Sequence, residues 1–170
     1  KTDLLTGVLS ANITAYHIIY DNYSQPVPGV ANARELAGEV TSEGIELDVM
    51  SKSFHGLSLI AGYSYNKTIF SESAYYVKGS RLRYNPSHTA NTSLYYTFQN
   101  SLLKGLSTGI TAFYMGDRMA GRSTNVDRQD YKLMPVPGFF QFDASVGYTL
   151  QNVSLRMKIS NLLNELSYHV

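Results

Sequence analysis

The 170-residue sequence contains no cysteine and no tryptophan. The absence of cysteine excludes a disulfide framework and any zinc or iron–sulfur site built on cysteine ligands. No run of about 18 apolar residues occurs, so no transmembrane helix is predicted, and the first residues do not resemble a signal peptide. Charged residues are few, at 16% of the chain, and their formal net charge is only +1. This near-neutral balance argues against a nucleic-acid-binding protein.

Tyrosine is abundant, at 14 of 170 residues. Because patterns with a helical period are missing, this composition favours an all-β protein. About seven segments alternate apolar and polar residues with the period of a strand. They are roughly Leu9–Asp21, Gly38–Met50, Leu57–Asn66, Ala90–Phe98, Leu106–Tyr114, Phe140–Thr149 and Val153–Ser160. Their polar positions are mostly small and hydroxylic, which is unusual for the solvent face of a soluble sheet and fits the wall of a lumen.

The connections between these segments are alternately long and short. The long ones are Asn22–Ala37, Ser71–Pro86 and Gly116–Pro137, and the short ones are Ser53–Gly56, Asn100–Gly105 and Gln151–Asn152. Antiparallel strands with long connections at one end and short ones at the other are typical of an outer-membrane barrel. Antibody-like sandwiches can also gather loops at one end.

Aromatic residues lie near the ends of the predicted strands. Phe140 and Phe142 lie at the long-loop end of their strand, Tyr148 at the other end, and Ala144 and Val146 between them. Aromatic rings favour the two membrane interfaces, with aliphatic residues between them. About ten residues per strand suffice to cross a bilayer when tilted. We therefore expect the apolar face to contact lipid.

Seven collinear stretches nearly cover the chain. They are KTDLLTGVLSANITAYHIIYDN (1–22), GEVTSEGIELDV (38–49), LSLIAGYSYN (57–66), NPSHTANTSLYYTF (85–98), LKGLSTGITAFYMGDR (103–118), VPGFFQFDASVGY (136–148) and KISNLLNELSY (158–168). In these stretches the sequence resembles the C-terminal part of the barrel of TonB-dependent outer-membrane receptors, especially the ferric-siderophore group.

The resemblance implies a 22-stranded antiparallel transmembrane barrel with an N-terminal plug folded inside it. Residues 1–170 are then expected to be the C-terminal portion of the barrel domain, strands fifteen to twenty-one, with the plug and the final strand absent. Seven strands cannot close an antiparallel barrel, and an open edge in lipid leaves backbone groups unsatisfied.

The resemblance also implies active import of iron–siderophore complexes, energised by the TonB–ExbB–ExbD complex, in the outer membrane of a Gram-negative bacterium. The ferric siderophore is cargo, and no cofactor is expected. The lipid bilayer and lipopolysaccharide are further expected partners.

Two long connections carry candidate ligand-binding residues. They are Tyr75, Tyr76, Arg81, Arg83 and Tyr84 in one, and Arg118, Arg122, Arg128 and Tyr131 in the next. Ferric siderophores are often anionic chelates with flat aryl or hydroxamate groups, which guanidinium and phenol groups suit. Alternatively, these arginines pair with lipopolysaccharide phosphates or with neighbouring loops.

Five charged residues are expected to face the lumen and the plug: Glu46, Asp48, Asp143, Arg156 and Lys158. Buried charges are normally paired, either with the plug or across neighbouring strands. The four histidines show no metal-ligand spacing, and no Ser/His/Asp group can be assembled, so neither a metal site nor an enzyme is predicted. An importer of a glycan, cobalamin or peptide and a passive porin-like barrel remain alternatives.

Overall fold

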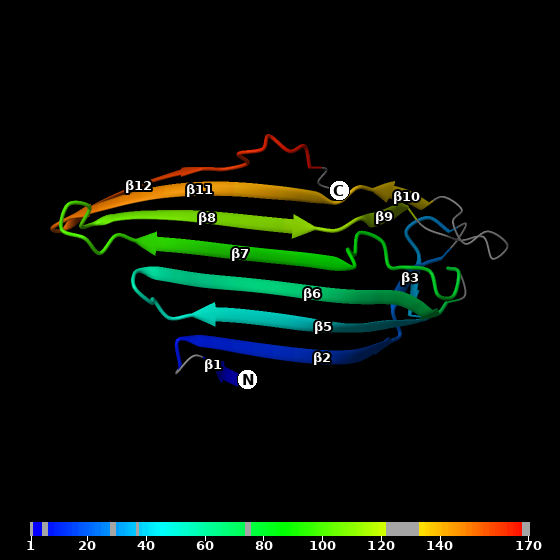
Figure 1. The fold of residues 1–170 in the computed structure, drawn as a ribbon. Coiled ribbons are helices and arrows are strands. Elements are labelled where there is room, and N and C mark those ends of the chain that lie inside the picture. The colour runs from blue at the N-terminus through cyan, green and yellow to red at the C-terminus, as the bar shows by residue number, and fades with distance from the viewer. Residues whose placement is uncertain are drawn as a thin grey trace.

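The computed structural model describes residues 2–4, 7–27, 30–36, 38–73, 76–121 and 133–167. Seven long strands lie side by side in one antiparallel sheet, as the alternation predicts (Figure 1). In spatial order they are β2 (Leu9–Asp21), β5 (Glu39–Ser51), β6 (Leu57–Glu72), β7 (His88–Thr97), β8 (Leu106–Met115), β11 (Phe139–Leu150) and β12 (Val153–Ile159). The short strand β1 (Thr2–Leu4) pairs with the edge of β2 and was not predicted, because three residues are too few to show alternation.

β6 is longer than its alternation pattern predicts, because it continues past Asn66 to Glu72. The added residues pair with β5, up to Glu39↔Glu72. β7 pairs with β6 only as far as Tyr65↔His88. The strands β2, β5 and β6 therefore extend beyond the rest of the sheet at one end.

Two small hairpins form within the long connections. β3 (Ser24–Pro26) pairs with β4 (Arg34–Leu36), and β9 (Arg118–Gly121) pairs with β10 (Leu133–Val136). Both hairpins lie at the end of the sheet where the long connections are found, which is called the loop end below (Figure 1). Each strand has only three or four residues, so the sequence pattern did not predict them.

The opposite end of the sheet, the turn end, carries the short connections. The connection between β11 and β12 is the two-residue turn Gln151–Asn152, in which Gln151 adopts a φ of 51°. A positive φ at a hairpin turn matches the right-handed twist of the two strands. The long and short connections thus alternate between the ends as predicted.

The register of the strands gives the sheet two different faces. One row runs across six strands as Ile13, Leu47, Tyr63, Ala90, Tyr114 and Phe140. The neighbouring row on the other face runs as Asn12, Asp48, Gly62, Asn91, Phe113 and Gln141. These are called the apolar face and the polar face. The apolar face is exposed along its length, with Ile13 at 71% and Leu155 at 75%.

Aromatic side chains form bands near both ends of the apolar face. Near the loop end, the ring of Phe140 lies 4.5 Å from Phe142 and 6.4 Å from Tyr114, measured between centroids. At the turn end, the rings of Tyr96 and Phe98 lie 5.0 Å apart. This arrangement matches the two predicted interfacial girdles. No helix in the described residues is long and apolar enough to cross a membrane.

Candidate functional site

The buried part of the described chain lies mainly at the loop end, where a small hydrophobic cluster supports a hollow. The cluster contains Val40, Phe70 and Tyr76, with Tyr23 and Leu82 packed against it. The Phe70 ring lies 5.8 Å from Tyr23 and 4.6 Å from Tyr76, between centroids. Such aromatic contacts stabilise the cluster beyond simple burial. The cluster therefore fixes three segments that are distant in the sequence.

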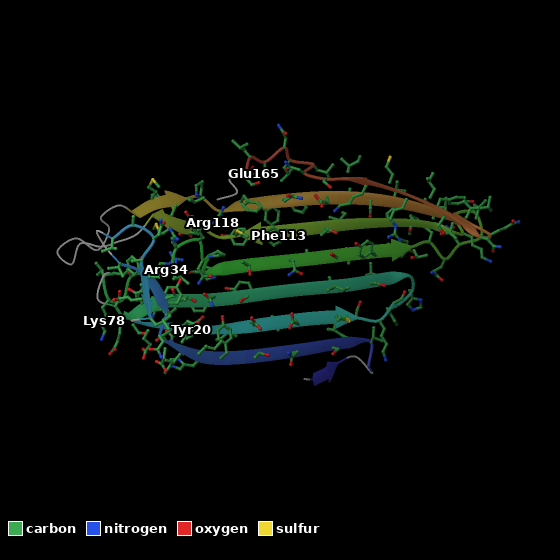
Figure 2. The ribbon with its side chains drawn as sticks, turned by 180° about the vertical axis from the view of Figure 1, so that it is seen from behind. Tyr20, Arg34, Lys78, Phe113, Arg118 and Glu165 are labelled. Carbon is green, nitrogen blue, oxygen red and sulfur yellow. The ribbon has the colours of Figure 1, made fainter. Side chains whose placement is uncertain are left out.

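The hollow above this cluster, called the loop-end hollow, has a volume of about 70 Å³. Its lining includes Tyr23, Arg34, Tyr76, Arg81, Arg83 and Gly121. These residues come from all three long connections. In Figure 2, Arg34 lies at the same end of the sheet as Lys78 and Arg118.

Three arginines line the hollow, and each is oriented by a local contact. Arg34 donates from Nε to Ser24 Oγ at 2.8 Å and from Nη2 to the Ser24 carbonyl at 3.0 Å. Arg81 lies with Nη1 3.7 Å from Asp117 Oδ2 and donates from Nη2 to Ser87 Oγ. The Arg83 guanidinium lies 5.4 Å from the centroid of the Tyr84 ring, within cation–π range.

Gln25 and Ser73 fix the β3–β4 hairpin against the second long connection. Gln25 is fully buried and accepts a hydrogen bond at Oε1 from Ser73 Oγ at 2.8 Å. Ser73 Oγ also accepts from the Tyr76 backbone N–H at 2.8 Å. A Cβ at Gly38 would overlap the Gln25 amide, so glycine at this position lets the β3–β4 hairpin pack with Gln25 buried. One hydroxyl thus joins the hairpin to a residue that lines the hollow.

A network of polar side chains lies on the polar face, further from the loop end than Val40 and Phe70 of the hydrophobic cluster. Asn66 donates from Nδ2 to Tyr16 Oη and to Ser42 Oγ, the latter at 3.0 Å. Its Oδ1 accepts from Thr68 Oγ1 at 2.8 Å and from Asn85 Nδ2. Asn66 therefore connects β2, β5 and β6 with the connection that carries Arg81 and Arg83.

Three of the predicted ligand-binding residues, Tyr76, Arg81 and Arg83, line the hollow. Tyr84 is adjacent, and its backbone N–H donates to the Met119 carbonyl at 2.8 Å. Arg118 lies in β9 and is 6% exposed. The remaining four, Tyr75, Arg122, Arg128 and Tyr131, lie outside the described residues. Ligand contact by any of the nine stays a prediction.

Sequence reasoning missed Tyr23, Arg34 and Phe70, which also line the hollow. Tyr23 and Arg34 belong to the first long connection, in which the same combination of a phenol and a guanidinium could have been noticed. Phe70 offers no such signal, because it lies in the part of β6 that the alternation did not predict.

The five charged residues expected to face the lumen all lie on the polar face. Asp143 pairs with Lys158, whose Nζ lies 2.7 Å from Oδ2. Glu46 and Asp48 line a second hollow of about 190 Å³ together with Asn91. For Glu46, Asp48 and Arg156, the described residues provide no ion-pair partner. Contact between these residues and a plug stays a prediction.

Residues 2–162 match the family described as TonB dependent receptor-like, beta-barrel. The chain belongs to this family. TonB-dependent receptors are outer-membrane β-barrel transporters of Gram-negative bacteria, not enzymes. Receptors of this family couple to TonB and bind a ligand. Within the described residues, no group of three or more His, Asp or Glu side chains could hold a metal ion.

Two curated receptors illustrate the similarity of sequence. The metal–pseudopaline receptor of Pseudomonas aeruginosa is 28% identical over 169 residues, which cover 99% of this chain and 23% of that receptor. The ferrioxamine B receptor of Salmonella typhimurium is 27% identical over 133 residues, which cover 75% of this chain and 18% of that receptor. The chain therefore spans less than a quarter of the length of these relatives.

Solved TonB-dependent receptors share the fold. The siderophore receptor PiuA from Acinetobacter baumannii matches with a TM-score of 0.76 at 19% identity, over 96% of this chain and 23% of PiuA. The ferric-catecholate import receptor Fiu from E. coli matches with a TM-score of 0.72 at 20% identity, over 96% of this chain and 22% of Fiu. The sheet thus corresponds to part of a TonB-dependent receptor barrel.

In such a barrel the apolar face contacts lipid, and the long connections lie on the extracellular side. A row of polar residues crosses the apolar face near the loop end of this TonB-dependent receptor. Glu43 Oε1 lies 3.0 Å from Lys67 Nζ, and Glu43 Oε2 lies 3.9 Å from His17 Nδ1. Charged groups are costly in the hydrocarbon region, so this row is expected at the level of the outer headgroups.

Proposed function

We propose that this chain is the C-terminal portion of the barrel domain of a receptor that imports iron–siderophore complexes across the outer membrane. The observation that carries the proposal is the loop-end hollow, where guanidinium and phenol groups from two extracellular connections meet beside Gly121 of the third. Arg81, Arg83 and Tyr76 suit an anionic chelate with flat groups. The similarity to the ferrioxamine B receptor supports the same class of cargo.

The proposed transport cycle begins with capture of the chelate at the extracellular end. A plug inside the barrel, supplied by an N-terminal segment, then rearranges under force from the TonB–ExbB–ExbD complex. Glu46, Asp48 and Arg156 contact this plug, since they lie on the polar face and the described strands leave them without an ion-pair partner. Lys67 and His17 lie at the headgroup level, where they contact lipopolysaccharide.

Uptake of iron by cells that carry the full-length receptor tests the proposal. The receptor is expressed in a strain that lacks its own siderophore receptors, and cells are supplied with ferric hydroxamates, catecholates or carboxylates. We expect one chelate class to support uptake, and we expect deletion of the tonB gene to abolish it. Uptake that persists without TonB would indicate a passive pore, and no uptake of any chelate would overturn the proposal.

A second candidate is import of a chelate of another transition metal. It is favoured by the similarity to the metal–pseudopaline receptor, which covers 99% of this chain. The name of that receptor specifies a metal without restricting it to iron. Loading the same chelators with zinc or nickel and measuring cellular metal content separates the two candidates. TonB-dependent gain of zinc or nickel without gain of iron would select this second candidate.

A further inference from the structure

The loop-end hollow is too small to hold a whole metal chelate. Its volume of about 70 Å³ is less than half of the roughly 150 Å³ of an apolar cavity that binds one benzene molecule. One small substituent of a ligand fits such a space, whereas an aromatic ring does not.

The charge around the hollow selects the kind of substituent. Among the described residues, three guanidinium groups line it, those of Arg34, Arg81 and Arg83, and no carboxylate does. The nearest opposite charge among the described residues is that of Asp117, whose side chain is 67% exposed. Its Oδ2 lies 3.7 Å from Arg81 Nη1. Within the described residues, neither Arg34 nor Arg83 has an ion-pair partner. The described part of the lining therefore carries excess positive charge.

The walls of the hollow strengthen its preference for an anion. Tyr23, Phe70 and Tyr76 enclose the arginines on the side of the buried cluster, where water is partly displaced. Attraction between charges is greater in such surroundings than in bulk water. A guanidinium group also presents its N–H donors as a planar fork that matches the two oxygens of a carboxylate.

We propose that the loop-end hollow is a subsite for one carboxylate group of the captured ligand. The guanidinium groups of Arg81 and Arg83 donate to the two carboxylate oxygens, and Arg34 contributes a third positive charge. Asp117 acts as an internal competitor, which the ligand carboxylate displaces from Arg81. The inference rests on the proposed function for its ligand, a metal chelate, and it adds that the chelate bears a carboxylate beyond those that bind the metal.

Protection of the arginines from chemical modification tests the subsite without any knowledge of the transported chelate. The full-length receptor in outer-membrane vesicles is treated with phenylglyoxal, which reacts with accessible guanidinium groups, and adducts are quantified by mass spectrometry. Succinate is the probe, and succinamide, which has the same shape without charge, is its control at matched ionic strength. The rate of modification of the same arginines without any probe is the reference.

We expect succinate to slow modification of Arg81 and Arg83 several-fold relative to the rate without any probe, and succinamide to have no effect. Equal protection by both compounds, or by neither, would overturn the subsite. In the variant Asp117→Asn, half-protection should require less succinate, because the competitor is removed. An unchanged requirement would show that Arg81 does not bind the carboxylate.

Paired substitutions provide a binding test on the same receptor. Replacing Arg81 and Arg83 together by glutamine should weaken protection of Arg34 by succinate roughly ten-fold, since charged hydrogen bonds are lost. The matched control is Lys78→Gln, an exposed charge on the same connection that does not line the hollow. If both variants weakened the protection of Arg34 equally, a general loss of positive charge would explain the result. That outcome would overturn the subsite.

The two proposals fail in different ways. The protection experiment uses neither iron nor transport, so an absence of chelate uptake would overturn the proposed function and leave a positive carboxylate result standing. Unselective protection would overturn the subsite and leave TonB-dependent uptake untouched.

Discussion

The ammonium group of Lys158 lies 2.7 Å from the carboxylate of Asp143, across the β11–β12 pair. The same carboxylate accepts a hydrogen bond from the Asn161 backbone N–H at 2.9 Å and another from Gln141 Nε2 at 2.9 Å. The Asn161 side chain in turn donates from Nδ2 to the Glu165 carbonyl and accepts at Oδ1 from the Glu165 backbone N–H. Asp143 therefore fixes the direction in which the chain leaves β12.

The first prediction concerns Asp143, which is buried. Asp143→Leu should leave the Asn161 N–H without its acceptor and cost roughly 1–3 kcal/mol of stability. Asp143→Asn should cost less, because its amide oxygen can still accept from Asn161. The measurement is the thermal midpoint of the purified full-length receptor in detergent. Lys158→Met serves as a control for the exposed ion pair, and an equal loss in all three variants would contradict the role assigned to Asn161.

The second prediction concerns Asn66, the centre of the polar network below the loop-end hollow. Asn66→Leu removes its contacts with Ser42 and Thr68 and with the connection at Asn85, each worth about 1 kcal/mol. We expect faster hydrogen exchange in residues 76–84 and weaker chelate binding. Asn12→Leu is the control, because Asn12 is exposed and its side chain donates a hydrogen bond to Thr14, two residues away on the same strand. Unchanged exchange in Asn66→Leu would show that the network does not support the hollow.

The third prediction concerns Gly44, which faces Tyr16 across the β2–β5 pair. A Cβ at Gly44 would overlap the Tyr65 carbonyl oxygen and the Tyr16 ring. The backbone cannot easily move away, so Gly44→Ala should destabilise the receptor by about 1–3 kcal/mol, as overpacking does. Chemical denaturation of the receptor in lipid vesicles measures this loss. Thr14→Ala, on the same face of β2, should leave the midpoint nearly unchanged, and a tolerated Gly44→Ala would mean that Tyr16 can turn away.

The long strands could be predicted because their side chains obey a simple rule. A strand in a barrel wall has lipid on one side and polar surroundings on the other, so its residues alternate with a period of two. In β2 this alternation predicts the observed bounds, Leu9–Asp21. It fails beyond Asn66 in β6, where the strand extends past β7. There β6 pairs with β5 on one edge and bonds to residues 79–82 on the other, through the bridge Ile69↔Arg81 and neighbouring backbone hydrogen bonds.

The site could be predicted only in part, because contacts between distant segments form it. Arg81 and Arg83 attracted notice as neighbours in one connection. Nothing local in the sequence places Arg34 beside them, since that requires the buried Gln25 to bond to Ser73. Burial of the β3–β4 hairpin depends on tertiary packing against distant segments, and an alternation pattern within one strand does not predict such packing.

The last prediction tests whether the apolar face contacts lipid. Ile110 pairs with Leu94 and Ala144, midway between the two aromatic bands, and is 52% exposed. A lysine there would lie near the bilayer midplane and cost about 2–4 kcal/mol, whereas Val153→Lys at the turn end would cost about 0–1 kcal/mol. The free energy of unfolding in lipid vesicles measures both.

Asn91→Lys is the control for the other face, because Asn91 lies on the polar face of β7, three residues from Leu94, the partner of Ile110. It should be tolerated, since a lysine there meets the lumen and the carboxylates of Glu46 and Asp48. A cost that follows depth at Ile110 and Val153 but not at Asn91 is expected only if lipid covers one face alone. Equal costs at all three positions would mean that a layer of protein, rather than lipid, covers the apolar face.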